Sequence, residues 1–599
     1  MWLIEDSLNN LSKRKYKSFS IVLGLFFLLA FSSPLFAADP LTIVVEGVED
    51  EVRDNVIAAL SLPEGFVAEG NVDRLLLKRL SLQADRKVKT AVEPFGYYNA
   101  KVDVQIEEKS PGEFLLRVIV SPGEPVRLAD VNVLLRGPGA AEEPLKRLAD
   151  SFPVAKGDVL LQQNYEETKE RLLSTAQELG YLDAAFVVHE IAIAKDALSA
   201  RIRLEMETGK QYFFDGATIV GAPNYSERFL HRYLLFKEGD VFSHEKLGET
   251  QMNFINSERF KEVNIVPEKD GAIEAKVPVL VLLKEGPRRS LRQGIGYGTD
   301  TGGRFSLRYR DLNMFHLGHE LHANLYLSEL LQGFSAAYVI PDDSDMKSSK
   351  SLQLNLQRED VSTYESDFIS VELGKTRSIG RESFATGYLR FQYENYAVGS
   401  QESYARLVMP GLRFSGNYYD NKPHPQKGFH YGVELRGTDE ILGSNMQLVQ
   451  AIAEGGFILP LPGQLFLHAR GKAARSILGD PLGDLPPSLR FFAGGDQSVR
   501  GYAYQSLGPR DASGQVVGGK HLLVGSVEVE RAIAEDWGVS VFYDAGNAFD
   551  SFSDFRIYEG VGMGLHYYTR VGALNFSVAR QIGVDDPGFR IHFTIGLGM

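Results

Sequence analysis

Residues 589–599 read Phe589-Arg590-Ile591-His592-Phe593-Thr594-Ile595-Gly596-Leu597-Gly598-Met599, and they alternate without a break. Apolar residues fall at the odd positions, whereas arginine, histidine, threonine and two glycines occupy the even ones. A period of two places successive side chains on opposite faces of a β-strand. This stretch therefore predicts a strand with one apolar face and one polar face.

The same alternation extends back through the carboxyl-terminal half of the chain. Leu352-Gln353-Leu354-Asn355-Leu356-Gln357 alternates strictly, and residues 321–327 follow the same pattern. Such strands can form a soluble sandwich, which buries the apolar face against a second sheet, or a membrane barrel, which turns that face toward lipid. At about 10 residues per strand plus connections, residues 286–599 accommodate roughly sixteen strands.

The amino terminus carries the pattern of an export signal, which favours the membrane barrel. Basic residues at positions 13–17 precede an apolar run, Ile21–Phe31, that is shorter than the roughly 20 residues of a membrane helix. Small residues follow this run. We therefore predict a signal peptide over residues 1–38, cleaved after Ala37 or Ala38, with a retained anchor as the alternative.

Composition excludes several classes of function. The chain has no cysteine, so neither disulfides nor thiolate metal sites are expected. Its net charge of −14 argues against a nucleic-acid partner, which requires a basic face. The mean hydropathy of −0.15 is compatible with a membrane barrel, because alternating strands average to a polar value.

A repeated motif divides the region before the barrel. Lys156-Gly157-Asp158-Val159 returns as Glu238-Gly239-Asp240-Val241, and a helix-like segment follows each copy. Each repeat ends in a strand followed by a glycine. This spacing predicts three α+β units, each ordered strand, helix, helix, strand, strand, of which the first lacks the motif. The predicted domains are residues 39–122, 123–208, 209–285 and, for the barrel, 286–599.

A loop motif, Val499-Arg500-Gly501-Tyr502, lies between stretches that read as strands. Further along the chain, Glu528 and Asp544 each place one acid on an apolar, alternating strand. This ordered trio resembles the Omp85 superfamily of outer-membrane barrels; three unrelated surface charges are the alternative. The resemblance implies that a long extracellular loop folds into the barrel lumen, where Arg500 pairs with Asp544 and Glu528. It also implies an antiparallel transmembrane β-barrel with an even number of strands, sixteen here.

The three α+β units resemble POTRA domains, the periplasmic modules that precede such barrels. Three units, rather than two or five, make the chain most similar to the TamA-type branch of the superfamily, the outer-membrane half of the translocation and assembly module. This resemblance implies an outer-membrane location in a Gram-negative bacterium, with the POTRA-like units in the periplasm. It also implies three kinds of partner: an inner-membrane-anchored TamB-like protein, unfolded outer-membrane protein substrates and outer-membrane lipid.

Glycines mark the first and last strands of the predicted barrel. Glycine removes a packing side chain and weakens a strand, so a barrel seam rich in glycine could open and expose an edge that templates an incoming strand. The alternative is that these glycines only permit barrel curvature. The predicted seam residues are Gly294, Gly296 and Gly298 on the first strand and Gly596 and Gly598 on the last.

The sequence offers no catalytic machinery. No Gly-x-Ser-x-Gly occurs, so the nucleophile elbow of a serine hydrolase is missing. The stretch 514–520 imitates a phosphate-binding loop, but His521 stands where a magnesium-binding serine or threonine is needed. We therefore predict no enzyme activity, no cofactor and no metal site.

The predicted function is that of an assembly factor. Such a protein inserts outer-membrane or autotransporter-type proteins through POTRA recognition and a weak lateral seam. Two alternatives remain open at this point: delivery of phospholipid from an envelope-spanning bridge, and secretion of a polypeptide through the lumen by a two-partner-type channel.

Overall fold

The computed structural model describes residues 41–62, 66–68, 71–110, 113–153, 155–342, 345–398, 401–421, 424–569 and 572–597. The predicted signal peptide, residues 1–38, lies outside these residues. Within the described ranges, no helix combines the length and the apolar composition needed to cross a bilayer. The chain divides into two compact units, residues 1–212 with 241–243 and residues 213–240 with 244–599.

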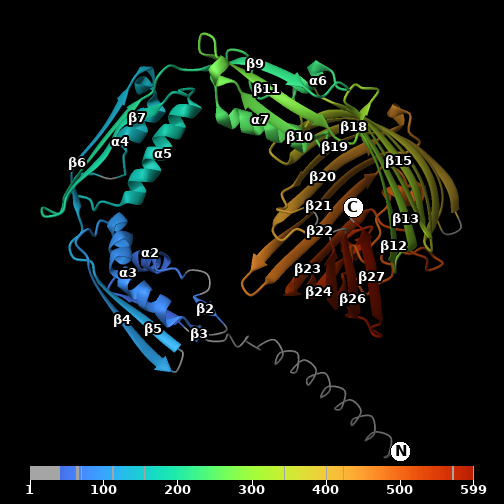
Figure 1. The fold of residues 1–599 in the computed structure, drawn as a ribbon. Helices are drawn as coiled ribbons and strands as arrows, with labels where there is room; N and C mark the ends of the chain where they lie inside the picture. Colours follow the sequence, from blue (N-terminus) through green and yellow to red (C-terminus); the bar gives the residue numbers. More distant parts are fainter. Residues whose placement is uncertain are drawn as a thin grey trace, which may run out of the picture. The chain divides into compact units, whose positions relative to one another are not determined.

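The first α+β sheet lies in the first unit (Figure 1). Its order is β1-β5-β4, with β1 parallel and β4 antiparallel to the central strand. Helix α3 begins where Asp73 accepts hydrogen bonds from the amides of Leu75 and Leu76, at 2.8 and 3.1 Å. The elements are β1 (Leu41–Glu46), α2 (Asp50–Ala59), β2 (Val67–Ala68), β3 (Asn71–Val72), α3 (Arg74–Val92), η1 (Glu93–Phe95), β4 (Lys101–Ser110) and β5 (Glu113–Ser121).

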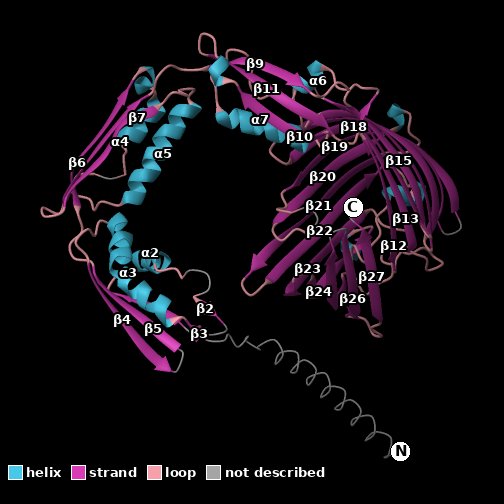
Figure 2. Cartoon of the chain, in the orientation of Figure 1, coloured by secondary structure: helices cyan, strands magenta, loops and turns pink. Residues whose placement is uncertain are grey.

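Two further sheets repeat this plan, with orders β6-β8-β7 and β10-β11-β9. Helices accompany the strands of these sheets, whereas the barrel is built almost entirely of strands (Figure 2). The second set is β6 (Arg127–Arg136), η2 (Pro138–Ala141), α4 (Glu143–Asp150), α5 (Gln162–Glu178), β7 (Ala185–Ala194) and β8 (Ser199–Glu207). The third is β9 (Phe213–Val220), α6 (Glu227–His231), α7 (His244–Asn256), β10 (Phe260–Pro267), η3 (Lys269–Gly271) and β11 (Lys276–Glu285).

The repeated Gly-Asp motif has the same local structure in both copies. Asp158 accepts a hydrogen bond from the amide of Ala155 at 2.7 Å, and Asp240 accepts one from Lys237 at 3.1 Å. The preceding glycines, Gly157 and Gly239, have φ values of +97° and +85°, which glycine adopts without the steric cost that other residues incur. The motif therefore encodes a tight turn before α5 and before α7.

The expected order of strand, helix, helix, strand, strand holds for the α-helices and main strands of all three sheets. One element was not expected. The short hairpin β2–β3 lies between α2 and α3, where Val67 pairs with Val72. Two-residue strands are too short to show a period, so no sequence pattern indicates them.

The remaining strands, β12 to β27, form a closed antiparallel barrel in which each strand pairs with its neighbour in sequence. The predicted sixteen-stranded antiparallel barrel is therefore confirmed. The strands are β12 (Arg289–Gly298), β13 (Gly302–Met314), β14 (His319–Ser328), β15 (Leu331–Pro341), β16 (Ser349–Val361), β17 (Tyr364–Ser378), β18 (Ser383–Val398), β19 (Gln401–Asn417), β20 (Gly428–Thr438), β21 (Leu448–Leu461), β22 (Leu465–Leu478), β23 (His521–Ala534), β24 (Trp537–Phe549), β25 (Tyr558–Thr569), β26 (Gly572–Ile582) and β27 (Phe589–Leu597).

The two faces of the barrel wall differ as the alternation predicts. On β23, Leu523 and Val527 expose about half of their surface to the outside, at 49% and 48%. Ser526, between them, is buried toward the lumen. Because a membrane barrel turns its apolar residues to lipid, the polar residues line the interior. A charged side chain at an even position of β23 or β24 thus lies in the lumen.

The third α+β sheet contacts the barrel within the second unit. Arg259 donates one hydrogen bond to the carbonyl of Gly318 and another to the carboxylate of Glu320, both at 2.9 Å. Phe229 packs against Gly318, where an added Cβ would lie only 2.2 Å from its ring. The turn between β13 and β14 therefore packs closely against this domain.

Candidate functional site

The candidate site is built on the long connection between β22 and β23, which we call the lumenal loop (residues 479–520). Arg490 organises it by donating hydrogen bonds to the carbonyls of Gly483, Leu485 and Val517, at 2.9, 2.6 and 2.9 Å. Isolated bridges, such as Ala493 with Leu507, pair distant parts of the loop. Much of the loop is thus held in one conformation by its own contacts.

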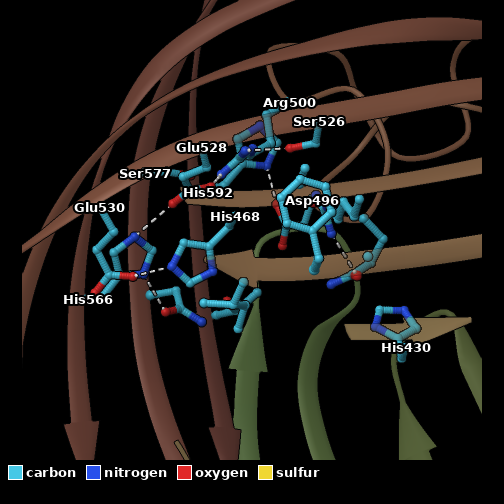
Figure 3. Close-up of a pocket in the computed structure, with 18 of the residues that line it drawn as sticks. His430, His468, Asp496, Arg500, Ser526, Glu528, Glu530, His566, Ser577 and His592 are labelled. Atoms are coloured by element: carbon cyan, nitrogen blue, oxygen red, sulfur yellow. Dashed lines mark hydrogen bonds and ion pairs between the residues drawn. The ribbon is translucent and has the colours of Figure 1, made fainter. Parts of the chain in front are cut away.

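Arg500, near the tip of the lumenal loop, binds both predicted acids. Its Nε and Nη2 donate to the two carboxylate oxygens of Asp544, at 2.7 and 2.9 Å. Its Nη1 donates to Glu528 at 2.8 Å. The Arg500 and Asp544 side chains are 9% and 0% exposed, and Figure 3 shows Arg500 beside Glu528 and Ser526. The structure therefore brings Arg500, Glu528 and Asp544 together inside the barrel.

Three further residues complete the surroundings of Arg500, and the motif did not reveal them. Its guanidinium lies 3.3 Å from the ring centre of Phe542, a stacking arrangement suited to a planar cation. Ser526 accepts a hydrogen bond from Arg500 at 3.3 Å, and His566 lies 3.0 Å from the other oxygen of Glu528. Ser526 and Phe542 each precede an acid by two residues, so strand parity alone places them on the same face.

The loop backbone also lies close to the barrel wall at this point. An added Cβ on Gly560, in β25, would lie 2.0 Å from the carbonyl oxygen of Arg500. Gly501 has φ +98° and accepts a hydrogen bond from Gln581 at 2.9 Å. Val499 and Tyr502, the outer members of the motif, are buried in an apolar cluster with residues of β22, β23 and β24. All four motif residues thus hold the lumenal loop against the barrel wall.

A second anchor holds the lumenal loop at a separate place on the wall. Glu394, fully buried on β18, accepts hydrogen bonds from Ser366 at 2.8 Å and Gln392 at 2.9 Å. It also accepts the backbone amide of Ser488 at 3.3 Å and the hydroxyl of the same residue. Ser488 lies in η6 (Pro487–Leu489) of the loop. No motif in the sequence pointed to Glu394.

The first and last strands meet at a weakly paired seam. The ladder between β12 and β13 runs over the whole of β12, from Arg289 to Gly298. By contrast, the described part of the chain shows a single ladder pair between β12 and β27, Gly298 with Thr594. Backbone hydrogen bonds hold a barrel closed, so this seam has far fewer interactions to break than any other junction in the wall.

The predicted seam glycines Gly294, Gly296 and Gly298 all lie on β12, which pairs with β13 along its length. Among the described residues, Gly298 is the one that also forms a ladder pair with β27. Gly596 is paired with Ala573 of β26, and Gly598 lies outside the described residues. The structure thus places Gly298 in the ladder that joins β12 to β27.

Below the loop tip the lumen contains a polar cavity of about 320 Å³, part of which is drawn in Figure 3. On its wall, the carboxylate of Glu530 lies 3.2 Å from the imidazole of His468. Asp496 and His592 line the cavity, and Asp300 lies beside them, with ligand-type atoms of the three within 4.8 Å of one another. Carboxylates and imidazoles are residue types that hold metal ions, so these three residues have the donor set of a cation site.

Comparison with known proteins agrees with the fold. Residues 313–599 match the Omp85 superfamily domain, and residues 42–122 match the family described as POTRA domain TamA domain 1. The outer membrane protein assembly factor BamA of Nitratidesulfovibrio vulgaris is 23% identical over 389 residues, which cover 61% of this chain and 48% of that protein. The chain therefore spans about half the length of this relative.

Two other BamA proteins are similar to this chain. BamA of Neorickettsia risticii is 22% identical over 532 residues, covering 83% of this chain and 69% of that protein. The crystal structure of Haemophilus ducreyi BamA lacking POTRA domains 1–3 superposes with a TM-score of 0.65 at 15% identity, covering 78% of this chain and 99% of that one. By the family match, residues 313–599 carry the Omp85 superfamily domain, and they form most of an outer-membrane β-barrel that follows periplasmic POTRA-type domains.

Proposed function

We propose that the protein is a non-enzymatic assembly factor that passes unfolded outer-membrane proteins into the bilayer through the seam between β12 and β27. The observation that carries this proposal is that the described residues form one ladder pair at that junction, Gly298 with Thr594. An unpaired strand edge presents free amide and carbonyl groups to another strand. An incoming strand could therefore pair with β12 or β27 as the seam widens.

The contents of the lumen favour this lateral route over secretion through the barrel. The lumenal loop is attached to the wall at Glu394 on one strand and at Glu528 and Asp544 on two others. A polypeptide that crossed the lumen would have to displace both anchors, including a buried, doubly paired arginine. Opening the seam leaves these contacts in place.

The seam can be tested by a disulfide across it. The chain has no native cysteine, so Gly298→Cys with Thr594→Cys introduces one pair at the observed register. With the barrel in lipid vesicles, oxidation is expected to slow the insertion of a urea-unfolded outer-membrane barrel to the rate of empty vesicles. Reduction should restore it. Insertion is measured by the gel mobility of the folded cargo.

The matched control places the disulfide at a fully paired junction. Ser335→Cys with Asn355→Cys joins β15 and β16 at an observed pair, and its oxidation should leave insertion unchanged. If the seam disulfide also leaves insertion unchanged, the lateral route is wrong. If it blocks transfer of labelled phospholipid to the vesicles and leaves protein insertion intact, the protein is instead a lipid-delivery component.

We assign the protein to the TamA-type branch, with an inner-membrane-anchored TamB-like partner and three POTRA-like units at residues 39–122, 123–208 and 209–285. The match of residues 42–122 to a POTRA domain of that type supports this assignment. Leu75 and Leu82, on α3, expose 75% and 76% of their surface. A photo-crosslinking residue at either position should capture a TamB-like protein in membranes; capture of other proteins alone contradicts the assignment.

A further inference from the structure

Three side chains from three separate segments meet beside the seam. Asp300 lies in the turn between β12 and β13, Asp496 lies in the lumenal loop, and His592 lies on β27. Their side chains are 7%, 12% and 3% exposed. The amide of Asp496 donates a hydrogen bond to Asp300 at 2.8 Å. His592 Nδ1 contacts the Asp496 carboxylate and lies 3.9 Å from that of Asp300.

The hydrogen bond to the His592 imidazole distinguishes between two interpretations of this cluster, a metal site and a cluster held together by a proton. The amide of Gly501 donates to His592 Nε2 at 3.2 Å, so Nε2 must carry a lone pair. In a neutral imidazole the proton then resides on Nδ1, which faces the two carboxylates. A metal ion would need the lone pair of Nδ1 and a proton on Nε2. The contact with Gly501 therefore favours a proton-mediated cluster over a metal site.

The cluster connects both edges of the seam through the lumenal loop. Asp300 follows directly after β12, two residues beyond the seam pair at Gly298, and His592 lies two residues before Thr594 on β27. Other described contacts across this junction include the amide of Thr299, which donates to the carbonyl of Phe593 at 3.2 Å. With so few interactions present, His592, which is buried, and the half-buried Asp300 and Asp496 contribute a large share of the closure.

The position of Asp496 is coupled to that of Arg500. The two residues lie four apart in a tight turn, in which Gly494 donates to the hydroxyl of Ser498 at 2.7 Å and Ser498 donates to the carbonyl of Gly495 at 3.2 Å. Gly501, next to Arg500, supplies the hydrogen bond to His592. A movement of the loop tip would therefore withdraw Asp496 and Gly501 from the seam together.

We propose that Asp300, Asp496 and His592 form a seam latch, which holds β12 against β27 for as long as the lumenal loop is seated. These are positioning residues, since they act on the seam and not on cargo. The inference rests on the proposed lateral route, because a latch matters to function only if the seam opens. Release of the loop tip then lowers the cost of separating the two strands.

The test measures seam width in the absence of cargo. Spin labels at Tyr297 and Ile591, both exposed on the outer face of β12 and β27, report the distance across the seam in vesicles. We expect one narrow distance in the otherwise wild-type barrel. In Asp300→Asn the open-to-closed ratio should rise about tenfold, the size expected for losing a hydrogen bond to a charged group, here the bond from the Asp496 amide. It should also rise in His592→Phe, which removes the contact with Asp496 and the hydrogen bond from Gly501.

Two variants separate the latch from a general loss of structure. His592→Asn keeps an N–H near the position of Nδ1 and should retain more of the closed seam than His592→Phe. Asp586→Asn, at an exposed site in the turn between β26 and β27, should give the same open-to-closed ratio as wild type. Labels at Phe334 and Leu352 span the regular β15–β16 junction, and the distance between them should be the same in every variant.

The outcomes distinguish the latch from the function on which it rests. An unchanged seam distance in His592→Phe and Asp300→Asn overturns the latch and leaves the lateral route standing. A widened seam with unaltered cargo insertion supports the latch and argues against the lateral route. If EDTA alone widens the seam of the wild-type barrel, the three residues bind a divalent ion and the latch as described is wrong.

Discussion

Arg500 shows how a barrel can hold a charge in its interior. Transferring an arginine from water is costly unless its donors are satisfied. Here four contacts reach Asp544, Glu528 and Ser526, and the guanidinium stacks on Phe542. The planar fork of arginine suits a carboxylate that accepts two parallel hydrogen bonds, a geometry that lysine cannot reproduce.

Arg500→Ala is expected to give a folded, inserted barrel with poor cargo insertion. Breaking a buried pair typically costs about 3–5 kcal/mol, because the partner charge remains unpaired. The barrel ladder is untouched, however, so the loop alone should be released. Arg500→Lys should also be impaired. Cargo insertion and protease sensitivity of the loop measure the effect, and Arg510→Ala, an exposed arginine in the same loop, is the control.

A double-mutant cycle tests whether Arg500 and Asp544 act as a pair. Asp544→Ala should resemble Arg500→Ala, and the double variant should be little worse than either, because residues that share one interaction are not additive. Cargo insertion is the measurement. Additive defects would show that the two residues act separately.

Gly560→Ala should displace the loop tip without changing any charge. An added methyl group would lie 2.0 Å from the carbonyl oxygen of Arg500, and backbone on both sides leaves it no room. We expect the same loss of cargo insertion as for Arg500→Ala, with the heat-resistant barrel retained. Gly303→Ala, where an added Cβ meets no atom within 4 Å, should behave as wild type. A fully active Gly560→Ala protein would show that close seating of the loop is unimportant.

At the scale of elements, the junction between the third α+β sheet and the barrel rests on few contacts. Arg259 is 4% exposed and binds the β13–β14 turn through Gly318 and Glu320. Asn313, at the end of β13, donates to the carbonyl of Asn224 at 2.8 Å. Hydrogen bonds therefore fix this domain to the barrel at the β13–β14 turn and, through Arg232 and the carbonyl of Asp345 at 3.3 Å, at the β15–β16 connection. The chain connection at residues 286–288 adds to them.

Arg259→Ala should loosen this domain from the barrel. The loss leaves Glu320 half satisfied, and removing one partner of a buried ion pair costs about 3–5 kcal/mol in the interior, less here because water reaches Glu320. Limited proteolysis should cut residues 286–288 faster than in wild type, while the barrel remains heat resistant. Lys261→Ala, at an exposed cation two residues further along the chain on β10, should leave the cutting rate unchanged. Equal rates in both variants would contradict a structural role for Arg259.

For the whole molecule, the closed ladder of β12 to β27 determines the behaviour in detergent. Fifteen of the sixteen junctions are paired along their length, so most backbone groups of the wall are satisfied and the barrel resists unfolding. The protein should therefore fractionate with the outer membrane and migrate faster in an unheated detergent gel than after boiling. Recovery in the soluble periplasmic fraction, or a mobility that does not change on heating, would contradict the membrane barrel.

Local patterns in the sequence determined most of the architecture. The period-two alternation indicated the barrel strands and the face each side chain takes, because the geometry of a strand fixes that parity regardless of context. The repeated Gly-Asp motif indicated the turns before α5 and α7 for the same reason, since its φ values and side-chain hydrogen bonds are local. Glu528 and Asp544 were found because strand parity and a family resemblance agreed on them.

Only the tertiary structure decided the contacts that join distant segments. Glu394 meets Ser488 across 94 positions in the sequence, and Gly501 meets His592 across 91, so neither pairing leaves a periodic signal. The seam register is of the same kind: glycines on β12 and β27 suggested a weak junction, but closing the barrel selected Gly298 and Thr594 as the pair. Alternation specifies which face a residue takes, whereas barrel closure and loop seating specify which residue it meets.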